Sequence, residues 1–539
     1  MNTLTLVAAT LALASAALAS TVSCEGQYCT VTTTSGRFNG TRNLNGLQWR
    51  GIHYGQAPVG DLRMADPQEY FTLDFLTLND AFDDPPMCPQ IGVDGTDEDC
   101  LYVNVYRPYY THSDDIPVMV WIHGGSFFWG GVSDPTIDAS YLANTEGIIV
   151  VTIQYRLGLF GFFDDGSDTN FAVKDALLAL KWVNQNIGSF GGDVSQITVA
   201  GESSGATMVR ALLSTEQSVG LFRRAIMQSD PMDFGFMNRS VSTGTILGLV
   251  NSTTGCTTIA CMRTLSIDAI NAASYEVLES ANADDPAVSF VTPLMPVIDG
   301  DLLTADFAQL VDNSSLPNPV PLLVGVVKNE ANGIISEEFP NVLNESAYEN
   351  AFKAFFGANR GAEILATGLF NLNSGVQDAV RLELGSAATL FYWKCPTYKV
   401  VNDWYTNLAK DFFIYEIDIG VNVAEYSGLS VCGDGTEYVC HQGDLELLFN
   451  TYDNSSGTIT ADQAAAALEV QRRWGAFVTR GNPNPTVAGE YYATWSPVQN
   501  NLIMSTLYIG QNQTLPSVYL LSCGLLGSIL HYDYQVYSE

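Results

Sequence analysis

One pentapeptide constrains this chain more than any other feature: residues 201–205, Gly-Glu-Ser-Ser-Gly, which have the form Gly-x-Ser-x-Gly. A β-type run, residues 195–200, precedes it, and a helix-type segment, residues 206–213, follows it. A strand that turns this sharply into a helix leaves no room for side chains beside the serine, so both flanking positions require glycine. The serine hydroxyl is thereby exposed at the carboxyl edge of a sheet. The pattern predicts that Ser203 is a nucleophile.

Short apolar runs rich in Val and Ile recur along the chain and are typical of strands buried on both faces. They are residues 117–123, 147–153, 196–200 and 319–327. Between them, residues 171–187 carry apolar side chains three or four positions apart, as on one face of a helix. Strands that alternate with helices predict an α/β fold with a mostly parallel sheet flanked by helices. The sequence has no repeat, low-complexity tract or Pro/Ser-rich linker, so we expect a single domain over residues 20–539.

The amino-terminal segment predicts export. Residues 4–18 are apolar and rich in Ala and Leu, and Ala17-Leu18-Ala19 is a small-x-small cleavage site. The segment before the apolar run carries no Lys or Arg, so the interpretation depends on the run and the cleavage site. We expect residues 1–19 to be a signal peptide. No later segment has the length and freedom from charge of a membrane span, so we expect a secreted protein without stable membrane insertion.

The cysteines and glycosylation sequons agree with an oxidising compartment. The chain has ten cysteines, and four pairs are closely spaced, as in loops closed by disulfides. These pairs are Cys24 and Cys29, Cys88 and Cys100, Cys256 and Cys261, and Cys432 and Cys440. Asn-x-Ser/Thr sequons occur at Asn39, Asn238, Asn251, Asn313, Asn344, Asn454 and Asn512. No cysteine pair has the partner pattern of a zinc site, so we expect no metal and no other cofactor.

The charge balance excludes some partners. The chain has 23 basic and 58 acidic residues, which give a formal net charge of −35. Such acidity disfavours binding to nucleic acid or to an anionic membrane. A hydrophobic content of 47% argues against disorder.

A serine nucleophile needs a histidine base, and the chain has five histidines. In α/β-hydrolases the order along the chain is Ser, acid, His, which leaves His441 and His531. His531 lies near the carboxyl terminus, where chains tend to fray. His441 lies in a glycine-rich loop that a bridge between Cys432 and Cys440 could hold, so we expect His441 to be the base.

The third group should be a carboxylate at the end of a strand between the serine and the histidine, because it must orient the imidazole and stabilise its cation. Glu330 follows the apolar run 320–327 and is the preferred candidate. Asp299 and Asp230 compete with it, although we interpret both as turn or capping residues. Spacing alone leaves the choice open.

The negative oxygen of the transition state needs preorganised N–H donors. The backbone N–H of Ser204, the residue after the nucleophile, should be one of them. Others should come from the glycine-rich loop at residues 121–127. His123, in that loop, is interpreted as a structural part of the turn.

These residues resemble the type B carboxylesterase/lipase family, which includes fungal lipases, animal carboxylesterases, cholinesterases and the non-enzymatic neuroligins. The resemblance covers almost all of the mature chain. Its motifs are residues 50–58, 98–105, 154–158, 175, 182–187, 190–193, 201–205, 221–226, 325–330 and 481–485.

The resemblance implies an α/β-hydrolase fold with a triad of Ser203, Glu330 and His441. It places the oxyanion donors at Gly125, Ser126 and Ser204, where the family often has glycine at the second position and alanine at the third. The two serines are departures from the family pattern, and Ser126 restricts the backbone where glycine would not. By the same resemblance the disulfides are Cys88–Cys100, Cys256–Cys261 and Cys395–Cys523, which leaves Cys24–Cys29 and Cys432–Cys440.

The loop between Cys88 and Cys100 is the most informative departure. In related lipases and cholinesterases it is long and forms a lid or a gorge wall, whereas residues 89–99 here have four acids and no aromatic side chain. We therefore expect a general carboxylesterase that acts by two-step acyl transfer on small uncharged esters. A triacylglycerol lipase is the alternative, followed by a cholinesterase. A neuroligin-like adhesion protein is the alternative of another class, disfavoured because all three triad residues are present.

Overall fold

The computed structural model describes residues 22–109, 115–285, 288–289, 291–373, 375–433, 435–452, 458–498, 505–511, 513–516 and 522–523. The expected signal peptide lies outside the described residues. So do His531 and the sequons at Asn454 and Asn512.

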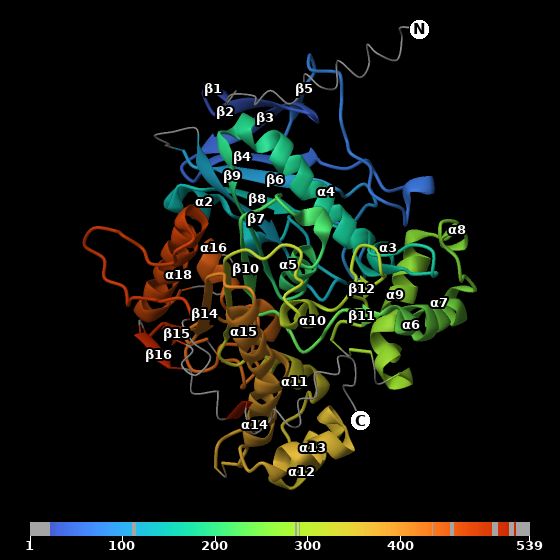
Figure 1. The fold of residues 1–539 in the computed structure, drawn as a ribbon, viewed down its shortest axis with the longest axis vertical. Coiled ribbons are helices and arrows are strands. Elements are labelled where there is room, and N and C mark those ends of the chain that lie inside the picture. The colour runs from blue at the N-terminus through green and yellow to red at the C-terminus, as the bar shows by residue number, and fades with distance from the viewer. Residues whose placement is uncertain are drawn as a thin grey trace.

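One large sheet, with fourteen strands in the described residues, organises the structure (Figure 1). Its order is β1-β2-β3-β4-β6-β8-β7-β9-β10-β13-β14-β15-β16, with β5 beside β3. The strands are β1 (Ser23–Glu25), β2 (Tyr28–Thr33), β3 (Gly36–Asn43), β4 (Gly46–His53), β5 (Leu78–Asp80), β6 (Tyr102–Arg107), β7 (Ile116–Ile122), β8 (Ile149–Ile153), β9 (Gly192–Glu202), β10 (Arg224–Gln228), β13 (Leu322–Val327), β14 (Phe412–Ile417), β15 (Ser505–Ile509) and β16 (Gln513–Pro516). A separate ribbon pairs β11 (Met237–Asn238) with β12 (Val297–Ile298).

The centre of the sheet is parallel, and its two ends are antiparallel except for β5, which pairs with β3 in parallel. Each neighbouring pair from β8 through β7, β9, β10, β13 and β14 to β15 is parallel. The pairs among β1, β2, β3, β4, β6 and β8, and the pair β15–β16, are antiparallel. Parallel neighbours need crossover connections, and helices supply most of the connecting chain between them.

Helices cover both faces of the sheet. Along β7, Val118 and Val120 pack into one apolar core together with side chains of α4 and α5, whereas Met119 and Trp121 pack into a second core with α2, α16 and α18. The helices are α2 (Ser140–Glu146), α3 (Gly158–Phe162), α4 (Phe171–Asn186), α5 (Ser204–Leu213), α6 (Arg239–Val241), α7 (Leu247–Thr254), α8 (Ile259–Met262), α9 (Ile267–Asp284), α10 (Phe307–Asp312), α11 (Asn332–Glu338), α12 (Tyr348–Phe356), α13 (Ala358–Ala366), α14 (Ala379–Ala388), α15 (Cys395–Asn407), α16 (Leu445–Phe449) and α18 (Ala461–Arg480). The predicted mostly parallel sheet between helices is confirmed (Figure 1).

Five disulfides join the pairs Cys24–Cys29, Cys88–Cys100, Cys256–Cys261, Cys395–Cys523 and Cys432–Cys440. These are the pairs expected from the sequence, and they are consistent with an oxidising compartment. Within the described ranges, no helix has the length and apolar character needed to cross a membrane.

The five sequons in the described residues differ in accessibility. Asn238, Asn251, Asn313 and Asn344 are exposed. Asn39 is half-buried within β3, which pairs with β2 on one side and β5 on the other.

Candidate active site

Ser203 lies at a sharp turn between β9 and α5. Its backbone has φ 55° and ψ −125°, an unfavourable conformation for a residue with a side chain. The turn is crowded: a Cβ atom on Gly201 would lie 2.4 Å from the carbonyl oxygen of Gly205, and a Cβ on Gly205 would lie 2.2 Å from that of Ile122. The Ser203 N–H donates to the Gln228 carbonyl of β10 at 2.9 Å. Both glycines are therefore required to hold the strained serine at the edge of the sheet.

Glu330 and His441 form a buried hydrogen-bonded pair. Glu330 follows β13 and its side chain is fully buried, with Oε1 accepting a hydrogen bond from the Val327 N–H at 2.8 Å. Its Oε2 lies 2.6 Å from Nδ1 of His441, which is 6% exposed. Because the backbone fixes one carboxylate oxygen, the other holds the imidazole in one orientation.

The opposite side of the imidazole faces the serine turn. Nε2 of His441 lies 3.2 Å from Oε1 of Glu202, the residue that precedes Ser203. The structure thus brings together three predicted site residues that are more than a hundred positions apart in sequence. Ser203 lies at the end of this turn and is largely buried, with 8% of its surface exposed.

The two competing carboxylates are engaged elsewhere. Asp299 accepts hydrogen bonds from the N–H groups of Asp301 and Leu303, which is the turn role that the sequence predicts. The expectation of a turn or capping role for Asp230 is wrong. Asp230, two residues after β10, forms a buried ion pair with Arg210 of α5 at 3.1 Å, and it accepts a hydrogen bond from the Thr207 hydroxyl of the same helix at 2.9 Å.

The carboxyl groups around His441 alter its acid–base properties. Burial lowers the pKa of His441, but the charges of Glu202 and Glu330 outweigh burial and raise it to about 9. Burial raises the pKa of Glu202 to about 8, although the charge of His441 opposes this. A raised pKa at His441 requires an ionised Glu202, whereas burial favours a protonated one. The two groups therefore compete for one proton.

Asp444 is a further buried acid close to His441, and its role was not predicted from the sequence. Burial and the charge of Glu330 raise its pKa to about 6. Its Oδ2 accepts a hydrogen bond from the Gln228 side chain at 2.8 Å, and Gln228 in turn accepts one from Trp474 at 2.7 Å. Since the Gln228 carbonyl also accepts the Ser203 N–H, this chain connects the histidine loop to the serine turn. The only sequence signal was the position of Asp444, three residues after His441.

The loop after β7 lies beside the serine. A Cβ on Gly124 would lie 3.1 Å from Cβ of Ser203. Gly125 has φ 109°, and Ser126 has φ 54°, in the left-handed region that favours glycine. In the described part of the chain, the N–H groups of Gly125, Ser126 and Ser204 have no hydrogen-bond acceptor. This arrangement leaves three N–H donors on the two segments that meet at Ser203.

Two neighbours support this loop. The N–H of Phe127 donates to the Ser204 hydroxyl at 3.3 Å, an interaction that alanine at this position would lack. His123 stacks on Tyr155, with ring centroids 4.5 Å apart, and its Nδ1 donates to the Gly124 carbonyl at 2.8 Å. Burial lowers the pKa of His123 to about 4, so it is neutral and structural, as expected.

The fold and the serine at the sharp turn after β9 together define a serine hydrolase with the α/β-hydrolase fold. A family profile described as "Carboxylesterase family" matches residues 27–519, and the chain belongs to this family. The fold class and the family predicted from the sequence are both confirmed.

Two relatives and one solved structure illustrate what this chain is similar to. The para-nitrobenzyl esterase of Bacillus subtilis (strain 168) is 28% identical over 506 residues, 88% of this chain and 94% of the relative. Carboxylesterase 1D of Rattus norvegicus is 35% identical over 317 residues, 53% of this chain and 54% of the relative. A solved structure of a PNB esterase superposes with a TM-score of 0.76 at 25% identity, covering 92% of this chain and 99% of that chain.

Proposed function

We propose that the chain is a secreted serine carboxylic ester hydrolase that acts on uncharged esters through Ser203, His441 and Glu330. One observation carries the proposal: the 2.6 Å contact between His441 Nδ1 and Glu330 Oε2, on an imidazole whose Nε2 lies beside the residue preceding Ser203. This is the arrangement in which a carboxylate keeps Nδ1 protonated and leaves Nε2 to act on a serine hydroxyl.

The reaction is two-step acyl transfer. Neutral His441 accepts the proton of the Ser203 hydroxyl as its oxygen attacks the ester carbonyl, and then gives that proton to the departing alcohol. Water attacks the resulting acyl-enzyme with the same proton transfers and releases the acid. Glu330 stabilises the imidazolium that forms in each step.

The N–H groups of Gly125, Ser126 and Ser204 are the proposed oxyanion donors. They come from two segments, the loop after β7 and the first turn of α5, which meet at the strained serine, where a Cβ on Gly124 would lie 3.1 Å from Cβ of Ser203. Backbone donors fixed before reaction need no reorganisation when negative charge develops on the carbonyl oxygen. Because backbone atoms provide the contacts, the serines at positions 126 and 204 are compatible with the role.

Two features support small, uncharged esters. The net charge of −35 disfavours anionic substrates. The segment between Cys88 and Cys100 is polar and largely exposed over residues 92–95, so it lacks the apolar underside that a lid of a triacylglycerol lipase would need. Relatives named para-nitrobenzyl esterase and carboxylesterase favour the same substrate class.

The chain is proposed to be exported and to form a single catalytic domain. The five disulfides support an oxidising compartment, and residues 1–19 would be removed as a signal peptide. Residues 20–539 would form one catalytic domain. The exposed sequons are the proposed glycan sites, whereas half-buried Asn39 is a poor acceptor.

Covalent labelling tests the proposal and separates it from an adhesion function. The purified chain and its Ser203→Ala variant are treated with a fluorophosphonate, the modified peptide is mapped by mass spectrometry, and hydrolysis of p-nitrophenyl butyrate is measured. We expect label on Ser203 alone and a loss of turnover of about 10^6 in the variant, the scale for loss of a triad nucleophile. A folded wild-type chain that neither takes up label nor hydrolyses any ester would indicate a binding protein instead.

A further inference from the structure

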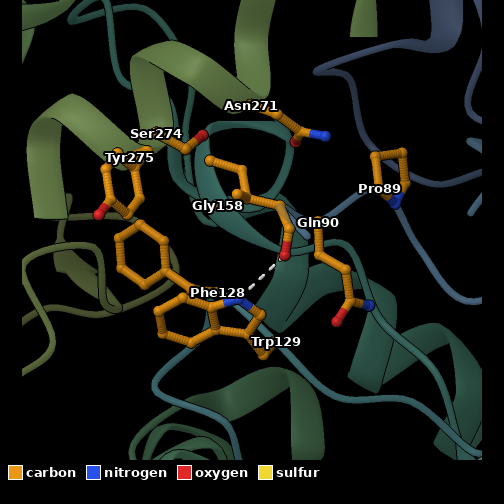
Figure 2. A pocket seen from close by; sticks show the side chains of 9 residues that line it. Pro89, Gln90, Phe128, Trp129, Gly158, Asn271, Ser274 and Tyr275 are labelled. Carbon is orange, nitrogen blue, oxygen red and sulfur yellow. Dashed lines mark hydrogen bonds between the residues drawn. The ribbon is translucent and has the colours of Figure 1, made fainter. Parts of the chain in front are cut away.

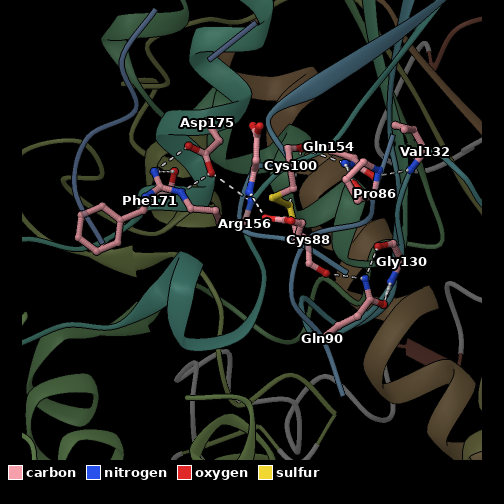
Figure 3. The surroundings of a disulfide bond; sticks show 12 residues. Pro86, Cys88, Gln90, Cys100, Gly130, Val132, Gln154, Arg156, Phe171 and Asp175 are labelled. Carbon is pink, nitrogen blue, oxygen red and sulfur yellow. Dashed lines mark hydrogen bonds and ion pairs between the residues drawn. A yellow bond between two sulfur atoms is a disulfide. The ribbon is translucent and has the colours of Figure 1, made fainter. Parts of the chain in front are cut away.

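A glutamine side chain connects the short disulfide loop to the loop of proposed oxyanion donors. Gln90 is buried, and its side-chain amide bonds both backbone groups of Gly130: Oε1 accepts from the N–H at 3.0 Å, and Nε2 donates to the carbonyl at 2.9 Å (Figure 3). Nε2 also donates to the Cys88 carbonyl at 3.1 Å. The side-chain amide thus makes the same two hydrogen bonds to the Gly130 backbone that a residue of a neighbouring β-strand would make.

A second bond joins the same two loops. The indole N–H of Trp129 donates to the Ile91 carbonyl at 3.3 Å. Gln90 and Trp129 line a small pocket between these loops and α9 (Figure 2). Consecutive residues of one loop are therefore bound to consecutive residues of the other.

The disulfide loop is itself well fixed. The Cys88–Cys100 bond closes it. Nε2 of Gln154 donates to the carbonyls of Cys100 and Pro86, both at 2.9 Å, and its Oε1 accepts from the Val132 N–H at 3.3 Å (Figure 3). Gln90 therefore lies near the end of a loop that a disulfide and hydrogen bonds to Gln154 hold in place.

The loop of oxyanion donors needs such support because its backbone is strained. Ser126 and Phe127 have φ of 54° and 63°, which residues with side chains adopt only when their surroundings enforce it. The loop then closes tightly, with the Phe128 and Trp129 N–H groups donating to the Gly125 carbonyl at 2.9 Å. Ser204 holds one side of the loop through the Phe127 N–H. Gln90 holds the other side through Gly130.

We propose that Gln90 is a positioning residue for the oxyanion donors, and that the Cys88–Cys100 loop braces these donors instead of covering the site. This inference rests on the proposed esterase function. Preorganised donors act mainly on the transition state, where charge develops on the carbonyl oxygen. Loss of the brace should therefore lower kcat and leave KM nearly unchanged.

The variant Gln90→Met removes both bonds to Gly130 with little change in volume. We expect kcat for p-nitrophenyl butyrate to fall about tenfold, less than the loss of about 10^2 to 10^3 for an absent donor, with KM within about twofold. Affinity for a trifluoromethyl ketone, whose adduct with the serine places an oxyanion among the donors, should fall by a similar factor. Gln56→Met is the matched control, because the Gln56 side chain is exposed and donates one 3.2 Å bond, to the Glu69 carbonyl.

The variant Gln90→Glu supplies a pH-dependent readout. Its carboxylate keeps an acceptor for the Gly130 N–H but places a charged oxygen against the Gly130 carbonyl. Protonation restores a donor, and burial raises the pKa of such a carboxyl. The ratio of variant to wild-type kcat should therefore rise as the pH falls, an effect that a purely structural role would not produce.

Active-site titration corrects every rate for the fraction of folded enzyme. Unchanged kcat and ketone affinity in Gln90→Met, losses of the same size in Gln56→Met, or a pH-independent ratio for Gln90→Glu would each overturn the positioning role. If Gln90→Met does not fold, the pH dependence of the kcat ratio between Gln90→Glu and wild type decides whether Gln90 positions the donors. Absence of turnover and labelling in wild type would instead refute the proposed function, and with it this inference.

Discussion

Nε2 of His441 lies 3.2 Å from Oε1 of Glu202. Glu330 contacts the other ring nitrogen at 2.6 Å, so the imidazole lies between two buried carboxyl groups. Negative charge on either side stabilises the imidazolium. The same charge that supports the transition state therefore also opposes the neutral histidine that must begin the reaction.

Glu202→Gln should move the acidic limb of the kcat/KM profile to lower pH. Ionised Glu202 helps to raise the pKa of His441 to about 9, and removal of a nearby opposite charge lowers the pKa of a histidine by about one unit or more. Because the active form has neutral His441, activity should persist further into acid in the variant. The measurement is kcat/KM for an uncharged ester across pH, for wild type and variant.

The control for this experiment is Glu437→Gln. Glu437 is exposed on the loop that leads to His441, so water screens its charge. Removal of the Glu437 charge should leave the acidic limb of the kcat/KM profile at the same pH. A limb at the same pH in Glu202→Gln and wild type would contradict the role assigned to the Glu202 charge.

Glu330→Gln should keep the shape of the site but lose the charge that stabilises the imidazolium. We expect kcat to fall by about 10^4 or somewhat less, with a far-ultraviolet circular dichroism spectrum like that of wild type. Asp299→Asn is the comparison, since Asp299 serves a turn. If Asp299→Asn were the damaging change and Glu330→Gln harmless, the carboxylate would have been assigned to the wrong strand.

Gly205→Ala should destabilise the chain by about 1–3 kcal/mol or more, because an added Cβ would lie 2.2 Å from the Ile122 carbonyl and force the serine turn away from β7. Gly248→Ala in α7 is the matched substitution, with no atom within 4 Å of the added Cβ. It should be neutral or stabilising by about 0.5–1 kcal/mol. Urea denaturation of the three proteins measures both effects. Equal stability of Gly205→Ala and wild type would show that the turn is less constrained than this geometry requires.

The centre of the fold was predictable because its sequence signals are local. Strands buried on both faces read as apolar runs, and the runs at 117–123 and 319–327 correspond to β7 and β13. The antiparallel strands β1 to β4, and β5, which pairs with β3 in parallel, were not identified. They are short or partly exposed, as the fully exposed β1 and β5 illustrate, so they lack a continuous apolar signal.

Only the part of the site with a local sequence signal was predictable from the residues themselves. The turn at Ser203 depends on adjacent glycines, whereas the choice among Glu330, Asp299 and Asp230 depends on distances across the fold. The resemblance to a family supplied what spacing could not, and the catalytic role of Glu330 stays a prediction until the variant is measured. Glu202 and Gln90 were not assigned roles, because their importance lies in contacts to distant residues.

The entrance to the site should need no lipid surface to open. A lid that opens on lipid makes activity rise sharply when the substrate exceeds its solubility limit. Here the segment between Cys88 and Cys100 is short and polar, and Gln90 and Trp129 bind it to the neighbouring loop, so we expect the entrance to be open in water. Hydrolysis of butyrate esters should follow simple saturation through the solubility limit, and long-chain triglycerides should be poorer substrates. A sharp increase in rate at the onset of emulsion, together with a preference for long-chain triglycerides, would identify a lipase with a cover formed by another segment.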